Sequence, residues 1–338
     1  MDLRERKNML NNKTILITGG TGSFGKAFTK YVLTHYDPKK IIIYSRDEFK
    51  QFLMQNEFSE YLPKLRFFIG DVRDKDRMKR AMEGVDYVIH AAALKQVPAC
   101  EYNPAEAIKT NINGAQNVID ASLDCGVKKV VALSTDKAVN PVNLYGGTKL
   151  VSDKLFIAAN AYAGTKDICF SIVRYGNVAG SRGSVIPKFH EMIKAGATKL
   201  TVTDYRMTRF WISLEEGVKL VIKALEESTG GETFISKIPS FKVTDLAQAM
   251  LPGCEMPEIG IYPGEKLHEI MVTVEDSLTT YEYEKHFIVY PQVRWNQRQT
   301  IIPGGKKVEE GFSYSSGNNT EWLSVEQIQE RLKTLHFE

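Results

Sequence analysis

A threonine, an acid, two lysines and a tyrosine lie close together in the middle of this 338-residue chain, in the order Thr135, Asp136, Lys137, Tyr145 and Lys149. The i,i+4 spacing of Tyr145 and Lys149 places both side chains on one face of a helix, one turn apart. The positive charge of a lysine held there would lower the pKa of the phenol and favour the phenolate. Such a tyrosine can take a proton from a sugar or alcohol hydroxyl while a hydride leaves the same carbon.

The elements around these residues are expected to bring them to a binding position. Residues 127–135 are apolar and β-branched, which predicts a buried strand with Thr135, Asp136 and Lys137 at its carboxyl end. In an open α/β sheet, ligands bind at the carboxyl ends of the strands. We therefore expect these three residues and the Tyr145/Lys149 pair to meet in one crevice. The competing interpretations are a Tyr/Lys pair on a helix surface and a surface ion pair of Asp136 with Lys137.

A glycine-rich turn near the start of the chain predicts a cofactor site. Residues 13–18 read as a strand, residues 26–34 as a helix and residues 39–44 as a second strand, with the turn between the first strand and the helix. Such a turn lets a pyrophosphate approach the helix N-terminus. This order of elements within about thirty residues indicates a dinucleotide fold. The turn residues expected to contact the cofactor are Gly19, Thr21, Gly22, Ser23, Phe24 and Gly25.

The end of the second strand favours NADP over NAD as the cofactor. An NAD site places a carboxylate there for the ribose hydroxyls. This chain has Ser45 at that point, followed by Arg46, whose guanidinium can pair with a 2′-phosphate and stack on adenine. Further cofactor contacts are expected from Lys50, Asp71, Val72, Ala91, Ala92 and Ala93, together with Tyr145 and Lys149.

Composition excludes several other classes of protein. The formal net charge is only +3 and the basic residues are interspersed with acids, so a nucleic-acid partner is not expected. No apolar run approaches the roughly 20 residues needed to cross a bilayer, so a membrane partner is not expected either. The four cysteines are scattered, which favours a reducing, cytoplasmic compartment and argues against a structural metal site.

The order of strands and helices predicts the fold class and two interleaved domains. Strands alternate with helices over residues 13–175, which predicts an α/β fold with a doubly wound parallel sheet and right-handed crossovers. We expect a dinucleotide-binding domain over 13–175 plus 211–237. A smaller substrate domain is expected over 176–210 plus 238–338, and a frayed N-terminal extension over 1–12.

Over nearly its whole length the chain resembles the extended short-chain dehydrogenase/reductases that act on nucleotide sugars. More narrowly it resembles the inverting UDP-N-acetylglucosamine 4,6-dehydratases that open pseudaminic acid synthesis. Retaining relatives carry Thr-Asp-Glu where this chain has Thr135-Asp136-Lys137. The segments that carry the resemblance are ITGGTGSFG (17–25), YSRDEFKQ (44–51), GDVRD (70–74), HAAALKQVP (90–98), STDKA (134–138), NLYGGTK (143–149), RYGNV (174–178), SRGSVIP (181–187), MTRFWISLEEG (207–217) and PGEKLHE (263–269).

The resemblance implies a reaction on UDP-N-acetylglucosamine and a homo-oligomeric state. Tyr145, assisted by Lys149, would remove the O4 proton while C4 gives hydride to NADP. Lys137, if burial and nearby charge hold it neutral, would take the C5 proton, and Asp136 would protonate the departing C6 hydroxyl. The substrate-binding residues it implies are Lys95, Asn177, Val185, Pro187, Arg209 and Glu265, with Arg174, Arg182 and Lys266 as alternatives.

The chain departs from the family pattern at two positions, and three alternatives to the inverting dehydratase stay open. Tyr262 stands where the family often has an arginine, so one expected phosphate contact is missing. Cys100, in the loop that reaches over the sugar, is either a small buried apolar residue or a thiol that changes proton delivery. Hydride could return to C4 and leave a 5,6-ene sugar, for which the same residues are needed. A 4-epimerase reaction would give Asp136 and Lys137 no task. A catalytically silent NADP-binding sensor would have no reason to keep the five candidate catalytic residues.

Overall fold

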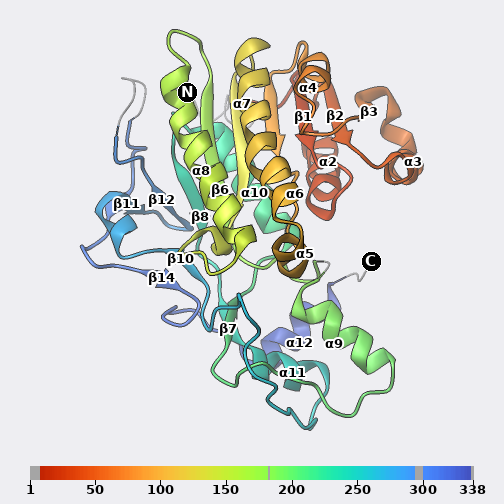
Figure 1. Ribbon diagram of the computed structural model, residues 1–338, viewed down its shortest axis with the longest axis vertical. Helices are drawn as coiled ribbons and strands as arrows, with labels where there is room; N and C mark the ends of the chain where they lie inside the picture. The colour runs from red at the N-terminus through yellow and green to blue at the C-terminus, as the bar shows by residue number, and fades with distance from the viewer. Residues whose placement is uncertain (1–7, 182, 294–299, 336–338) are drawn as a thin grey trace.

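A single large sheet organises the computed structural model, which describes residues 8–181, 183–293 and 300–335. Within that part of the chain the sheet has ten strands, in the order β13-β11-β12-β8-β6-β5-β4-β1-β2-β3 (Figure 1). The strands are β1 (Thr14–Thr18), β2 (Lys40–Ser45), β3 (Leu65–Ile69), β4 (Tyr87–His90), β5 (Lys129–Thr135), β6 (Cys169–Tyr175), β8 (Thr233–Ser236), β11 (Thr280–Glu282), β12 (His286–Val289) and β13 (Lys306–Lys307).

The order of the parallel strands reverses at β1. Strands β1 to β6 and β8 pair in parallel, and β12, β11 and β13 continue the sheet antiparallel. From β1 the chain first builds β2 and β3 on one side, then β4, β5 and β6 on the other. Strand β1 is buried along its whole length, as expected of an apolar strand with both faces covered. The predicted doubly wound α/β fold is confirmed, with its switch point between β1 and β4.

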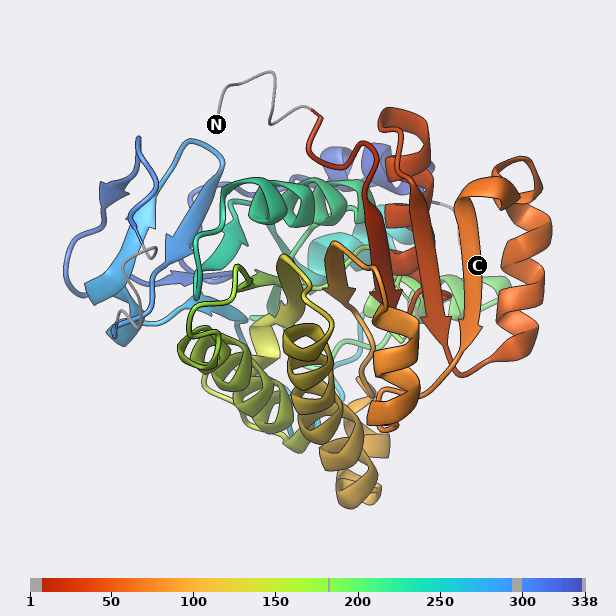
Figure 2. The ribbon, with the colours of Figure 1, turned by 90° about the horizontal axis from the view of Figure 1, so that it is seen from above.

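Helices cover both faces of the sheet. Figure 2 shows α10 on one side and α7 and α8 on the other; α2 packs with α10, and α4 packs with α7. The helices are α2 (Ser23–His35), α3 (Glu48–Glu57), α4 (Lys75–Met82), α5 (Val97–Tyr102), α6 (Pro104–Ile108), α7 (Gly114–Asp124), α8 (Leu144–Tyr162), α9 (Val185–Lys194), α10 (Leu214–Glu227), α11 (Val243–Met250) and α12 (Val325–Lys333). Short helical turns are η1 (Ser59–Lys64), η2 (Lys109–Asn113), η3 (Asp136–Ala138) and η4 (Glu275–Thr279).

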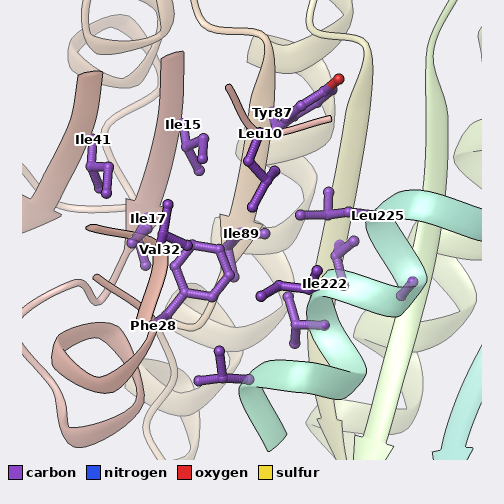
Figure 3. Close-up of a cluster of buried hydrophobic side chains, with 14 of the residues drawn as sticks. Leu10, Ile15, Ile17, Phe28, Val32, Ile41, Tyr87, Ile89, Ile222 and Leu225 are labelled. Atoms are coloured by element: carbon purple, nitrogen blue, oxygen red, sulfur yellow. The ribbon is translucent and has the colours of Figure 1, made fainter. Parts of the chain in front are cut away.

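The core on the α2/α10 side corrects one expectation about the N-terminus. Phe28 of α2, Ile17 of β1 and Leu225 of α10 meet there, all fully buried (Figure 3). Leu10 enters the same cluster with no exposed surface, and Met9 is also buried. Residues 1–7 lie outside the described part of the chain. The expectation of a frayed extension over 1–12 is therefore wrong for these two residues, because their apolar side chains complete the core.

A second lobe lies next to the carboxyl ends of the parallel strands (Figure 1). Its own core joins α9, α11 and α12 through residues such as Phe189, Leu246 and Ile328. Two small sheets complete it, β7 (Thr208–Phe210) with β9 (Ser240–Lys242), and β10 (Ile270–Val272) with β14 (Tyr314–Ser315). Strands β11 to β13 return to the main sheet, which thus crosses the boundary expected at residue 237. We keep the interleaved two-domain division as a proposal.

A close contact between α8 and η3 generates a stability prediction. A Cβ atom at Gly146 would lie 2.1 Å from the backbone carbonyl oxygen of Lys137, whereas a Cβ at Gly147 would meet nothing within 4 Å. Gly146→Ala should therefore force α8 away from η3 and lower the free energy of unfolding by about 1–3 kcal/mol. Gly147→Ala, in the same helix, should raise it by up to about 1 kcal/mol. Urea unfolding of both variants checks this, and equal effects would contradict it.

Candidate active site

A cleft of about 740 Å³ opens at the carboxyl ends of the parallel strands, beside the switch point. Its volume is that of a ligand-binding site. The cleft brings together every residue that the sequence analysis assigned to the cofactor. Its lining includes Gly19, Thr21, Gly22, Ser23, Phe24, Gly25, Ser45, Arg46, Lys50, Asp71, Val72, Ala91, Ala92, Ala93, Tyr145 and Lys149.

The glycine-rich turn is shaped for the close approach of a phosphate group. Gly22 is the N-cap of α2 and supplies no capping side chain, so the first turn of the helix faces the cleft. At Gly25 a Cβ atom would lie 2.3 Å from the carbonyl oxygen of Gly20, so a larger residue would push the helix away from the turn. These features fit the pyrophosphate of a dinucleotide at a helix N-terminus.

The far end of the cleft is formed by residues at the end of β2 and the start of α3. The Oγ of Ser45 lies 2.8 Å from the Oγ1 of Thr21, in the place where an NAD site carries its acid. Arg46 is about half exposed, with its Nη1 3.6 Å from the Oδ2 of Asp71. Asp47 accepts a hydrogen bond from the backbone N–H of Lys50 at 2.9 Å and so caps α3. The cleft therefore has the form and the groups of a nicotinamide-dinucleotide site.

Tyr145 and Lys149 occupy the first turns of α8, as the sequence predicts. Asn143 caps this helix by accepting a hydrogen bond from the N–H of Gly146 at 2.8 Å. Burial raises the pKa of Tyr145 to about 12, and the charge of Lys137 opposes that rise. The Nζ of Lys149 donates to the carbonyl of Leu133 at 2.7 Å, and burial lowers the pKa of this lysine. The expectation that Lys149 lowers the pKa of Tyr145 is therefore wrong for this structure: burial raises that pKa, and the charge that opposes the rise is that of Lys137.

Lys137 lies at the centre of the polar contacts in the site. Its Nζ donates to the Oδ1 of Asp136 at 3.2 Å, the Oδ1 of Asn177 at 3.1 Å and the Oε1 of Glu269 at 3.2 Å. Burial alone would lower the pKa of Lys137, but the charges of Asp136 and Glu269 raise it above its usual value. The expected neutral lysine is therefore not what the structure shows. Two buried carboxyl groups beside the amine favour the ammonium form.

Asp136 lies behind the cleft wall and has no exposed surface. Thr135 donates a hydrogen bond to its Oδ1 at 2.9 Å. Burial and the charge of Glu269 raise the pKa of Asp136, which favours the protonated acid. Thr135 and Lys137 line the cleft in front of it. The five residues of the predicted catalytic set thus do meet at one place, although only four of them reach the cleft surface.

Glu269 is the residue that the sequence analysis missed. It lies just before β10 and is 3% exposed, whereas Glu265, chosen from the same segment, is exposed. No spacing in the sequence links Glu269 to Lys137, because the two residues are more than a hundred positions apart and only the packing of the second lobe joins them. A buried acid next to a buried lysine could have been sought, but burial at Glu269 is a tertiary property.

The predicted substrate residues fall into two groups. Lys95 and Asn177 line the cleft, and Val185 and Pro187 form the first turn of α9, directly after the cleft residue Ser184. Arg209 and Glu265 do not belong to the lining that the structure describes.

Arg209 and the alternatives named beside it have other partners. The guanidinium of Arg209 donates to the backbone carbonyls of Thr208 and Lys266, and its contact with a diphosphate stays a prediction. Arg174 and Lys266 also bind backbone carbonyls away from the cleft surface, and Arg182 lies outside the described residues.

Other observations limit what this site can be. Cys100 is 1% exposed and packs with Ala107 and Tyr145, which confirms the interpretation as a small buried residue. Among residues 8–181, 183–293 and 300–335, no group of three His, Cys, Asp or Glu side chains is arranged to hold a metal ion. Within the same ranges, no helix is both long and apolar enough to cross a bilayer.

Comparison with known proteins places the chain among sugar-modifying enzymes. It is 58% identical to a UDP-N-acetylglucosamine 4,6-dehydratase (inverting) of Campylobacter jejuni subsp. jejuni serotype O:2, over 95% of this chain and 98% of that protein. It is 43% identical to a UDP-glucose 4-epimerase of Rickettsia canadensis, over 97% and 98%. The solved structure of Pen from Bacillus thuringiensis is 41% identical with a TM-score of 0.87, over 96% and 98%.

The family assignment agrees with the fold and with the contents of the cleft. The family described as "Polysaccharide biosynthesis protein" matches residues 15–291, a range that extends from β1 to β12 of the main sheet. The glycine-rich turn and the Tyr145/Lys149 pair both lie within this range. The chain belongs to this family of extended short-chain dehydrogenase/reductases.

Proposed function

We propose that the chain is an NADP-dependent UDP-N-acetylglucosamine 4,6-dehydratase that inverts the configuration at C5. The observation that carries the proposal is the buried Asp136 carboxyl directly behind Lys137, which lines the same cleft as Tyr145. An oxidation at C4 needs only the tyrosine and its lysine. An acid and an amine next to them supply the proton transfers that loss of water requires. The relative from Campylobacter supports the same substrate and outcome.

The residues divide the reaction between them. Tyr145 takes the proton of O4 and, with Lys149, faces the cofactor side of the cleft. A bound nicotinamide dinucleotide supplies the chemistry of hydride removal at C4 and hydride return at C6. The 4-ketone acidifies the C5 proton, which Lys137 takes in its neutral form. Because two carboxyl groups stabilise the resulting ammonium, Lys137 is a strong base with a small neutral fraction.

Asp136 completes the elimination as the general acid. Its raised pKa keeps a proton available for the C6 hydroxyl, which leaves as water. The C5–H and C6–O bonds break, and a C5–C6 double bond forms. Hydride return to C6 and a proton delivered to C5 from the opposite face give UDP-2-acetamido-2,6-dideoxy-L-arabino-hex-4-ulose. Return of the hydride to C4 would instead give the 5,6-ene sugar.

A 4-epimerase is the second candidate function, because a relative with that name is 43% identical over nearly the whole chain. An epimerase needs the tyrosine and the cofactor but no acid at C6. In this chain Asp136 is buried with a raised pKa next to the amine that faces the cleft. Keeping a carboxyl group in such surroundings is costly without a task for it. We therefore favour the dehydratase.

The proposal also includes the cofactor, the substrate contacts, the oligomeric state and the cellular compartment. NADP is favoured because Ser45 and Arg46 end β2 without an acid at the ribose position. Lys95 and Asn177 line the cleft and are the residues that we assign to the UDP-sugar. We further propose a cytoplasmic homo-oligomer whose product enters pseudaminic acid synthesis.

Incubation with UDP-N-acetylglucosamine and NADP should give the 4-keto-6-deoxy sugar. Proton NMR of the mixture checks this, since a C6 methyl doublet, an exocyclic alkene and a C4 epimer give separate signals. Tyr145→Phe should form no product and no reduced cofactor, because its ring cannot take the O4 proton. Near-normal turnover by this variant would contradict the role of Tyr145, and a C4 epimer from the unaltered protein would establish the second candidate instead.

Arg46→Ala tests the choice of cofactor. Loss of a charge-assisted contact worth roughly 1.5–3 kcal/mol should weaken NADP binding at least about tenfold. NAD has no 2′-phosphate and should lose less affinity, so the ratio of the two dissociation constants is the quantity to measure, by calorimetry. Equal affinity of the unaltered protein for NAD and NADP would overturn the assignment.

Lys137→Ala and Asp136→Asn should stop the reaction at different points. Without the amine, C4 should still be oxidised, but the C5 proton should no longer exchange with solvent. With the amide in place of the acid, C5 exchange should persist while the C6 hydroxyl stays on the sugar, because an amide does not deliver the proton. Mass spectrometry and NMR of reactions in deuterium oxide separate the two. Full exchange and full dehydration in both variants would show that the acid and base lie elsewhere.

A further inference from the structure

Glu269 is a buried carboxylate that approaches the active site from behind Lys137. It precedes β10 and keeps only 3% of its surface exposed. Its Oε1 lies 3.2 Å from the Nζ of Lys137 and 3.7 Å from the Nε of Arg209. Glu269 is absent from the described residues that line the cleft. It can therefore act on a bound molecule only through its neighbours.

Lys137 lies between two buried carboxyl groups. The Oδ1 of Asp136 and the Oε1 of Glu269 are each 3.2 Å from the same Nζ. Arg209 is a second cation beside Glu269, whereas Asp136 shares the Lys137 ammonium with that glutamate, so burial favours the neutral form at Asp136 rather than at Glu269. The remaining oxygens, Asp136 Oδ2 and Glu269 Oε2, are buried and have no hydrogen-bond partner within the part of the chain that the structure describes. A proton on one of these carboxyl groups removes a buried charge.

The surrounding charges decide which carboxyl group holds the proton. Burial opposes the ionised form of Glu269, but Lys137, Arg209 and Lys266 together lower its pKa. For Asp136, burial and the negative charge of Glu269 raise the pKa. The charge of Lys137 and the hydrogen bonds from Thr135 and Lys137 oppose this rise without cancelling it. Arg209 and Tyr145 of α8 are the other charged or titratable groups that act on Lys137. Glu269 is thus the ionised member, and Asp136 is the acid.

We propose that Glu269 is a positioning residue that keeps Asp136 in its acid form, with Lys137 held between the two carboxyl groups. The inference rests on the proposed function, in which Asp136 gives its proton to the departing C6 hydroxyl while Lys137 takes the proton of C5. After that step Asp136 is a carboxylate, Lys137 is an ammonium, and water has left. Glu269 takes no proton itself. It makes the charge on Asp136 unfavourable before the step.

The charges determine in which direction a substitution at Glu269 shifts the titration of Asp136. Removing the negative charge of Glu269 makes ionisation of Asp136 easier, so the acid form should be lost at a lower pH. A neighbouring charge at these distances shifts a titration by about one to three pH units. Glu269→Gln keeps the size of the side chain and an oxygen that accepts from Lys137, but removes the charge. Glu269→Asp keeps the charge on a shorter side chain.

Infrared spectroscopy of the NADP-bound protein without any sugar tests this directly. The carbonyl band of a protonated carboxyl group, assigned to Asp136 by its loss in Asp136→Asn, should be present at neutral pH. In Glu269→Gln its midpoint should move to lower pH by about one unit or more. Glu269→Asp should retain most of the original midpoint, and Glu275→Gln, an exposed glutamate of η4, should leave it unchanged. An unaltered protein without this band, or an unchanged midpoint in Glu269→Gln, overturns the inference.

The reaction itself gives a second readout. With UDP-N-acetylglucosamine, loss of water by Glu269→Gln should fall off at a lower pH than in the unaltered protein, while C4 oxidation, followed by the absorbance of the reduced cofactor, keeps its pH profile. A purely structural role would slow both steps and leave both profiles in place, which would contradict the proposal. If the unaltered protein does not convert this sugar, the proposed function is wrong, and the infrared titration still decides the role of Glu269.

Discussion

The ammonium of Lys137 is the contact on which the arrangement of the site depends. It joins three segments that are distant in the sequence: η3 at the end of β5, Asn177 after β6, and Glu269 before β10. The first two directly follow strands of the main sheet, and the third belongs to the second lobe. Removing one partner would leave a buried charge without compensation, at a cost of about 3–5 kcal/mol. The contacts of Lys137 therefore shape the wall of the cleft and also set the charges of the catalytic groups.

Close backbone packing around this contact leaves little room for change. Helix α8 approaches η3 so closely at Gly146 that no side chain fits, and this approach carries Tyr145 to the same cleft as Lys137. Asn143 caps α8 and also donates to the carbonyl of Gly264 in the second lobe at 2.8 Å. The helix that bears the tyrosine is thus held from both sides. Such support keeps reacting groups within the small tolerances that catalysis needs.

Burial gives the catalytic groups pKa values that they do not have in water. The pKa of Tyr145 rises to about 12, that of Asp136 rises and that of Lys149 falls, in each case with desolvation as the largest cause. Groups whose protonation is shifted in opposite directions within one cleft are typical of acid–base sites. The distribution of charge also explains why a lysine can stand at position 137: two carboxyl groups make its ammonium form favourable.

Local sequence patterns were enough to predict the fold class, the residues of the cofactor cleft and the four catalytic groups at its surface. Those features depend on local patterns: apolar β-branched runs for the strands, glycines between strand and helix, and a fixed spacing along one helix face for Tyr145 and Lys149. The charge of Lys137, its contact with Glu269 and the positions of Arg209 and Glu265 outside the cleft lining follow from the packing of distant segments. It also placed Leu10 in the core. Protonation and burial depend on which groups come together from distant segments, and neither local pattern nor spacing contains that information.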